Sequence, residues 1–133
     1  MIVVDTSVVL NALCDVGVKG EQARAALLAD DNFAAPAHFP IEFLSSLRGL
    51  VLGKKIVVED AAAALKAFKE LGIEIFPATE MDLERAWSLR ENITAYDAAY
   101  ISLAERLGAA LITQDARLSR TGQQSKCAVR VLS

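Results

Sequence analysis

The sequence predicts an α/β fold in which helices cover both faces of a mostly parallel β-sheet. Short apolar runs alternate along the chain with longer segments of helical periodicity, an order that requires crossover connections between parallel strands. Hydrophobic residues make up 53% of the chain but aromatic residues only 6%, which favours helices packed on a buried sheet over a β-sandwich. A length of 133 residues indicates one domain, residues 1–133.

Short apolar segments bounded by turn residues are predicted as strands. The first is a β-branched run that suits a buried strand ending at Asp5. Pro36 ends a second strand, and Pro77 ends a third. The predicted strands are residues 2–4, 32–35, 73–76, 110–113 and 128–132.

Segments with apolar residues at helical spacing lie between these strands. Ser7 is a candidate N-cap for the first helix, and Gly17 and Gly20 are expected to break the chain before the second. Glycines at 53, 72 and 108 mark the ends of three later helices. The predicted helices are residues 7–15, 21–29, 39–52, 59–71, 80–91 and 95–107, with a short turn or helix reaching Arg120.

The charge balance and the cysteine usage narrow the possible functions. A net charge of −3 argues against a generally basic nucleic-acid-binding domain. No apolar run approaches the roughly 18 residues of a membrane span, and no basic segment precedes the first apolar stretch as in a signal peptide. Cys14, Cys127 and the lone His38 have the spacing of neither a disulfide framework nor a zinc site. We therefore expect a cytoplasmic protein with reduced core cysteines.

Four acidic residues occupy positions where a ligand site is expected. Asp5 follows the first predicted strand and Asp115 follows the strand 110–113, so both fall at the carboxyl edge of the sheet, where α/β proteins bind ligands. Asp97 lies in the first turn of a helix and is expected to point inward, because its neighbours one turn later are mostly apolar. Glu42 has only small residues beside it on its helix face, which leaves room for a ligand.

Each of these acids also has an ordinary structural interpretation. Asp5, Asp97 and Asp115 are well placed to cap or begin helices, and Glu42 suits a solvated helix face. As a group they suggest more, because carboxylates brought together repel one another and a divalent cation removes that cost. An all-oxygen ligand set selects Mg²⁺ or Mn²⁺, which binds phosphate oxygens and activates water.

These residues carry a resemblance to a known family. The segments 2–7 (IVVDTS), 94–105 (TAYDAAYISLAE) and 111–118 (LITQDARL), with 41–42 and 47–48 between them, resemble a PIN-domain protein, specifically a VapC-type ribonuclease toxin. The resemblance implies a PIN-like parallel sheet of about five strands and a Mg²⁺-dependent endoribonuclease that hydrolyses the phosphodiester bonds of RNA. It also implies a cognate antitoxin protein and commonly a homodimer.

The resemblance assigns roles by position. Asp5, Glu42, Asp97 and Asp115 match the family's acidic quartet, with Asp5, Asp97 and Asp115 as metal ligands and Glu42 ligating a second metal or acting through water. The hydroxyls of Thr6, Ser7 and Thr113 are expected to support these ligands.

Cations near the quartet are candidates to bind the phosphates of RNA. Arg117 has the strongest claim because it follows Asp115 by two residues, and Arg48 and Arg120 are the other candidates. Lys54 and Lys55 are better explained as a solvated face. The apolar excess suggests surface for self-association or for an antitoxin helix, and this surface is expected on the helices 39–52 and 59–71. His38 is expected to be structural, and Trp87 to lie in the core or an interface.

Other functions remain open at this stage. A phosphoaspartyl hydrolase needs a second aspartate two residues after Asp5, where this chain has Ser7, so we set it aside. A receiver-like signalling domain needs further acids beside Asp5 and a lysine after a late apolar strand, and Lys126 follows no such strand. A PIN scaffold that binds RNA or protein without cleavage keeps the same residues and is the main alternative.

Overall fold

A parallel five-stranded sheet forms the centre of the molecule, as predicted. A computed structural model of the protein describes residues 1–121 and 125–132, without the side chains of 120 and 121. The strand order is β3-β2-β1-β4-β5, and every neighbouring pair is parallel. The strands are β1 (Ile2–Val4), β2 (Phe33–Pro36), β3 (Glu74–Phe76), β4 (Ala110–Thr113) and β5 (Val129–Val131).

Six α-helices within the described residues connect the strands, and their positions match the predicted ones closely. A short 3₁₀ helix, η1 (Ala116–Thr121), follows β4. The α-helices are α1 (Thr6–Cys14), α2 (Val18–Leu28), α3 (Phe39–Leu52), α4 (Val58–Glu70), α5 (Glu80–Ser88) and α6 (Ala95–Leu107).

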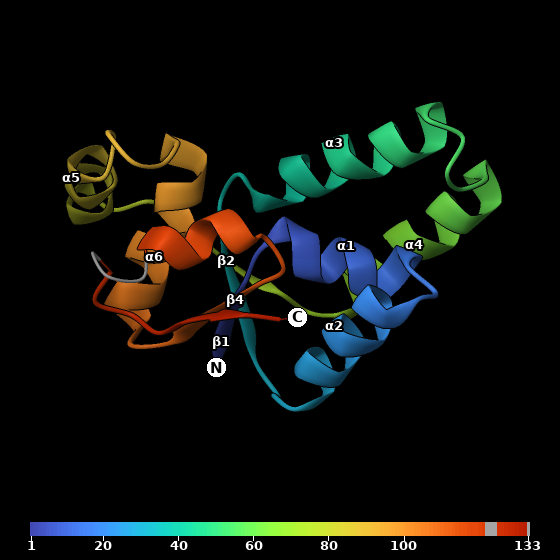
Figure 1. The fold of residues 1–133 in the computed structure, drawn as a ribbon, viewed down its shortest axis with the longest axis horizontal. Coiled ribbons are helices and arrows are strands. Elements are labelled where there is room, and N and C mark those ends of the chain that lie inside the picture. Colours follow the sequence, from blue (N-terminus) through green and yellow to red (C-terminus); the bar gives the residue numbers. More distant parts are fainter. Residues whose placement is uncertain (122–124, 133) are drawn as a thin grey trace.

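The helices are divided between the two faces of the sheet. From β1 to β3 the chain moves outward in one direction along the sheet, and it then returns through α5 and α6 to place β4 on the other side of β1. Because crossovers of one hand made in opposite directions lie on opposite faces, α1 to α4 gather on one side of the strands and α5 and α6 on the other (Figure 1). The prediction of helices on both faces is confirmed.

The core is centred on β1. All of its residues are buried, and Val3 pairs with Ala34 of β2 on one side and Leu111 of β4 on the other. The helix α6 packs across β1, β2 and β4 and contributes the buried Ile101 and Tyr100. This packing fixes the carboxyl ends of β1 and β4 side by side. Within the described residues, none of the helices is long and apolar enough to traverse a bilayer.

Several helix boundaries differ from the prediction, and α5 ends at Ser88 rather than at 91. The N-cap of α1 is Asp5, whose side chain accepts a hydrogen bond from the backbone N–H of Val8, so the assignment of the cap to Ser7 was wrong. The helix α2 begins at Val18, before Gly20 rather than after it. Gly20 therefore lies inside the helix. A Cβ at this position would lie only 1.8 Å from the carbonyl oxygen of Asp15, so only glycine allows α2 to pack against the end of α1.

Candidate active site

The candidate site lies where the direction of the chain across the sheet reverses. β1 and β4 are adjacent, and each continues at its carboxyl end into an acidic residue, Asp5 and Asp115. This reversal point is where open α/β sheets bind ligands, because the loops from the two strands diverge and leave a crevice. The sheet therefore brings together two acids that are far apart in the sequence.

Asp5 is buried, and three separate groups donate hydrogen bonds to its carboxylate. Its Oδ1 accepts hydrogen bonds from the Ser7 hydroxyl at 2.6 Å and from the backbone N–H of Val8 at 3.2 Å. Its Oδ2 accepts one from the hydroxyl of Thr113, at the end of β4. Burial raises the pKa of Asp5, and the charge of Asp115 adds to that effect, while the hydroxyl and backbone donors oppose it. The structure thus places Ser7 and Thr113 in the supporting positions predicted for them.

Asp97 lies in the first turn of α6, where Thr94 caps the helix by accepting a hydrogen bond from the Asp97 backbone N–H at 3.2 Å. Its carboxylate is half-buried and faces the cleft, as predicted. Burial raises its pKa, the nearby charge of Arg117 lowers it, and the charges of Asp115 and Glu42 raise it. The net pKa is above the usual range, so the neutral form of Asp97 is favoured relative to an exposed aspartate.

Glu42, in the first turn of α3, is held by two hydroxyls. Tyr100 donates a hydrogen bond to its Oε1 at 2.5 Å, and Thr6 donates to the same oxygen at 3.1 Å. His38 occupies the N-cap position of α3, and its ring packs between those of Tyr96 and Tyr100. Its buried Nε2 lies 3.5 Å from Glu42 Oε1 but makes no hydrogen bond. The histidine predicted to be structural therefore lies beside the site.

Asp115 is the one acid of the four that a cation holds directly. Its carboxylate receives hydrogen bonds from Nε and Nη2 of Arg117, the shortest at 2.6 Å, and also accepts the backbone N–H of Arg117. These bonds lower the pKa of Asp115. The Asp115 backbone N–H bonds to the Thr113 hydroxyl at 2.9 Å, so Thr113 links the two strand-end acids.

All four predicted acids line a single cleft of about 370 Å³. They come from four separate parts of the chain, and two of them, Asp5 and Asp97, have raised pKa values to which the other carboxylates contribute. The other residues around the cleft are Thr6, Ser7, Leu10, Asn11, Ser46, Tyr100 and Arg117.

The donor set fits Mg²⁺ in kind. The four acidic side chains offer only oxygen atoms as ligands, and a divalent cation would relieve the mutual repulsion of their carboxylates. As the side chains stand, no three His, Cys, Asp or Glu residues among those described converge closely enough to enclose a metal. Mg²⁺ does not require such a cage, because it commonly keeps several waters and binds through one or two carboxylates.

The predicted cations are not all at the cleft. Arg117 lines it, whereas Arg48 is exposed on α3 and is not among the lining residues. The side chain of Arg120 lies outside the described residues. Trp87 is 68% exposed and carries Arg90 over its ring at 4.8 Å, so its placement in the core was wrong and an interface role stays a prediction. The two cysteines are free and half-buried.

Two contributions to the site were not anticipated. Tyr100 reads from the sequence as an apolar core residue, and it is buried, but its hydroxyl reaches Glu42. Asn11 lines the cleft and donates to Gln114 at 2.8 Å, while the backbone N–H of Gln114 donates to Ser7. The available signal was that Asn11 and Tyr100 follow Asp5 and Asp97 by one or two helical turns, but the sequence alone does not say whether such polar atoms face the site.

Comparison with known proteins identifies the family. The PIN domain family model matches residues 2–124. Ribonuclease VapC9 of Mycobacterium tuberculosis is 39% identical over 132 residues, 99% of this chain and 98% of the relative. Among solved structures, VapBC2 from Rickettsia felis bound to a promoter DNA fragment superposes with a TM-score of 0.71 at 16% identity, covering 100% of both chains. VapC20 of M. tuberculosis, described as a Sarcin-Ricin loop cleaving toxin, gives 0.69 at 17% identity, with 92% of this chain and 95% of that one covered.

The match extends over nearly the whole fold. It agrees with the resemblance seen in the sequence motifs and not with a receiver-like domain. The chain therefore belongs to the PIN-domain family, and within that family to the VapC type.

Proposed function

We propose that the protein is a Mg²⁺-dependent endoribonuclease and the toxin of a toxin–antitoxin pair. The observation that carries the proposal is the acidic cleft, which carboxylates from the end of β1, from α3, from α6 and from the end of β4 line at the topological switch point. The relatives of the same family that are named ribonucleases support RNA as the substrate class. Mn²⁺ is expected to substitute for Mg²⁺, because both prefer oxygen ligands.

Asp5 and Asp97 are the residues that would hold the metal, and Asp115 would either join them or orient the attacking water. When bound, Mg²⁺ supplies a Lewis acid that polarises the scissile phosphate and lowers the pKa of water. Ser7 and Thr113 keep the carboxylate of Asp5 in a fixed orientation through their hydroxyls. Glu42 presents a carboxylate to the same cleft, where it can accept a proton or hold water.

RNA must be held in spite of the net charge of −3. Arg117 is 78% exposed in its side chain and lies at the rim, so it can turn from Asp115 to a phosphate oxygen without uncovering buried surface. Arg48 and Arg120 remain candidates for more distant phosphates.

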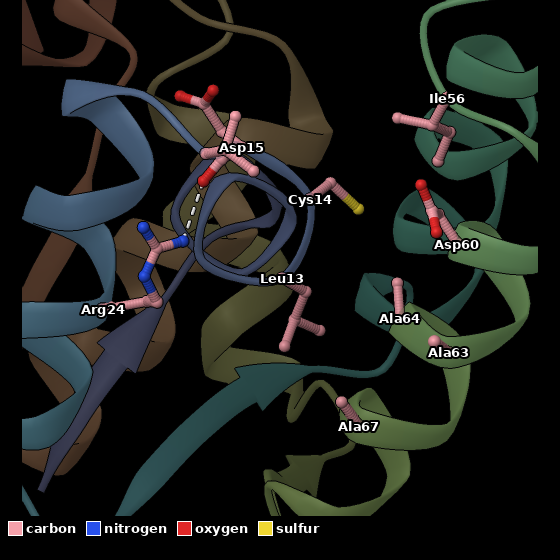
Figure 2. A pocket seen from close by; sticks show the side chains of 10 residues that line it. Leu13, Cys14, Asp15, Arg24, Ile56, Asp60, Ala63, Ala64 and Ala67 are labelled. Carbon is pink, nitrogen blue, oxygen red and sulfur yellow. Dashed lines mark hydrogen bonds between the residues drawn. The ribbon is translucent and has the colours of Figure 1, made fainter.

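The proposed protein partners are a cognate antitoxin and a second copy of the chain. Solved toxin–antitoxin complexes among the structural neighbours support an antitoxin. The helix α4, one of the two on which partner surface was predicted, forms one side of a cleft of about 450 Å³. The helices α1 and α2 form the other side, and Leu13, Cys14 and Ile56 are among the lining residues (Figure 2). The exposed Ile41, Leu44 and Leu52 on α3 support a homodimer. A cytoplasmic location is proposed with this function.

The test is cleavage of total cellular RNA by the wild type beside Asp97→Asn, with Mg²⁺, with Mn²⁺ and with a chelator. The variant is nearly isosteric, so its fold should persist while cleavage falls by at least about 10²-fold, because one of the metal ligands has lost its charge. Equal cleavage by both proteins would show that Asp97 only begins a helix. A wild type that binds RNA in a gel-shift assay but never cleaves it would favour the catalytically silent PIN module instead.

A further inference from the structure

Glu42 is held from two other helices through one of its two oxygens. The hydroxyls of Tyr100 on α6 and Thr6 on α1 both bond to Oε1, and they lie 3.3 Å from each other. The three oxygens form a closed triangle between helices on opposite faces of the sheet. Within the described residues, no hydrogen bond to Oε2 is found, so this oxygen is left for whatever occupies the cleft.

Tyr100 is a rigid donor. It is only 2% exposed, and its ring packs edge-on against His38, with centroids 5.2 Å apart, and against Phe39 at 6.5 Å. Burial and the hydrogen bond to Glu42 raise the pKa of Tyr100 above its ordinary value, so the phenol keeps its proton and remains a donor. A donor fixed by packing restricts the carboxylate it bonds to, which a solvent-exposed donor cannot do.

We propose that Tyr100 is a positioning residue that fixes the Glu42 carboxylate, with Thr6 as its companion. Both hydroxyls engage Oε1, which directs Oε2 into the cleft to accept a proton or hold a water during RNA hydrolysis. The proposal rests on the proposed ribonuclease function in that Glu42 is taken as part of the reacting site. It adds a residue that acts through Glu42 and does not itself touch RNA or metal.

The test compares Tyr100→Phe with Tyr96→Phe. The first change removes one hydroxyl and keeps the packed ring, while the matched control removes the hydroxyl of a tyrosine that also packs on His38 but is 64% exposed. In Tyr100→Phe, kcat should fall roughly 10- to 100-fold, the range expected for a lost hydrogen bond to a charged group. The KM for RNA and the calorimetric affinity for Mg²⁺ should both stay within about twofold, and Tyr96→Phe should match the wild type.

A double-mutant cycle separates positioning from any other role. In a Glu42→Ala background, Tyr100→Phe should have less than about a twofold further effect, because the hydroxyl has lost the group through which it acts. Additive losses, or a fall in activity explained by KM or by Mg²⁺ affinity, would overturn the proposal. If Tyr100→Phe proves too unstable to assay, Thr6→Val removes the other hydroxyl and should give a smaller loss of the same kind.

A structural readout keeps the proposal separate from the ribonuclease activity. Crystal structures of the wild type and of Tyr96→Phe should show Glu42 in one rotamer with Oε1 against Tyr100, whereas in Tyr100→Phe the carboxylate should leave that position. An unchanged Glu42 in Tyr100→Phe would refute the positioning role even if cleavage fell. A wild type without any nuclease activity would refute the proposed function instead, and the crystal comparison would still decide whether Tyr100 fixes Glu42.

Discussion

Two groups of carboxylates in this molecule have different hydrogen-bond donors. On the α5–α6 side, Glu105 receives both Nε and Nη2 of Arg85, at 2.8 and 3.0 Å, and Asp82 receives Nε of Arg106 at 3.1 Å. In the cleft, hydroxyls and backbone N–H groups bond to Asp5 and Glu42 instead.

The difference separates a structural use of an acid from a chemical one. A guanidinium neutralises a carboxylate and satisfies both of its oxygens, so nothing is left for a ligand. A hydroxyl orients a carboxylate but leaves its charge in place. The pKa shifts follow this division, because burial would raise the pKa of Glu105 but the bonds from Arg85 and Lys126 bring it below its ordinary value, whereas those of Asp5 and Asp97 are raised.

The largest effect on stability is expected when the carboxylate that pairs with Arg85 loses its charge. Glu105→Gln keeps the shape of the side chain but removes the charge that Arg85 and the Lys126 backbone N–H bind, so the free energy of unfolding should fall by about 1–3 kcal/mol. RNA cleavage below the unfolding temperature should be unchanged. Urea denaturation measures the first quantity, with the exposed Glu84→Gln on α5 as a control expected to stay within about 0.5 kcal/mol. A Glu105 variant as stable as that control would mean that the ion pair contributes nothing.

The opposite sign is expected in the cleft. Asp97→Asn removes a charge that burial and two neighbouring carboxylates disfavour, so without divalent metal at pH 7 it should raise the free energy of unfolding by about 0.5–1 kcal/mol. Added Mg²⁺ should stabilise the wild type more than the variant, because binding to the folded state alone adds stability. Thermal melts with and without Mg²⁺ measure both effects, and a destabilised variant would contradict the picture of a strained acidic site.

Lowering the pH should remove both differences in stability, the gain of Asp97→Asn and the loss of Glu105→Gln. Asp97 has a raised folded pKa, so its charge costs stability above that pKa and the cost disappears once the pH is below its ordinary 3.8. Glu105 has a lowered folded pKa, so its contribution is present above its ordinary 4.5 and is lost as the pH falls through the folded value. The advantage of Asp97→Asn and the deficit of Glu105→Gln should therefore both shrink toward zero in urea titrations near pH 3.

The smallest effect is expected at the one place where the two treatments meet, the pair of Asp115 and Arg117. This bridge is exposed, so it adds little stability, and Arg117→Gln should chiefly weaken the binding of RNA. We expect the KM to rise roughly threefold to tenfold, the salt dependence of binding to weaken by about one phosphate contact, and kcat to stay within about twofold. Lys66→Gln, an exposed change on α4, is the control. A lower kcat at unchanged KM would place Arg117 in the chemical step.

The sequence predicted the sheet and its acidic edge well because both depend on local patterns. The apolar runs place Asp5 and Asp115 at strand ends, and parallel strands bring such ends to one edge whatever their separation in the chain. The start of α2 was missed because it depends on a backbone contact between Gly20 and Asp15 that only the packed structure reveals.

The partners of the acids were harder to predict than the acids. Tyr100 and Thr6 lie 58 and 36 positions from Glu42, the acid that both bond to, and their spacing in the sequence is compatible with an apolar core. Arg85 closes a structural ion pair with Glu105, whereas Arg117 borders the cleft. The position of Arg117 two residues after Asp115 did predict its place at the cleft, whereas the pairing of Arg85 with Glu105, 20 residues away, depends on tertiary packing.

The central position of β1 also sets the order in which the site is assembled during synthesis. The hydroxyl of Thr113 that fixes Asp5 belongs to β4, 108 residues later in the chain, and β4 must pair directly with β1. Until that segment has been made, one edge of β1 has no partner, and Asp5 lacks both its Thr113 donor and its acidic neighbour. Such non-local pairing is slow to form. The nascent chain therefore carries Asp5 for most of its translation without a completed cleft, and the proposed ribonuclease site is assembled only after β4 has been synthesised.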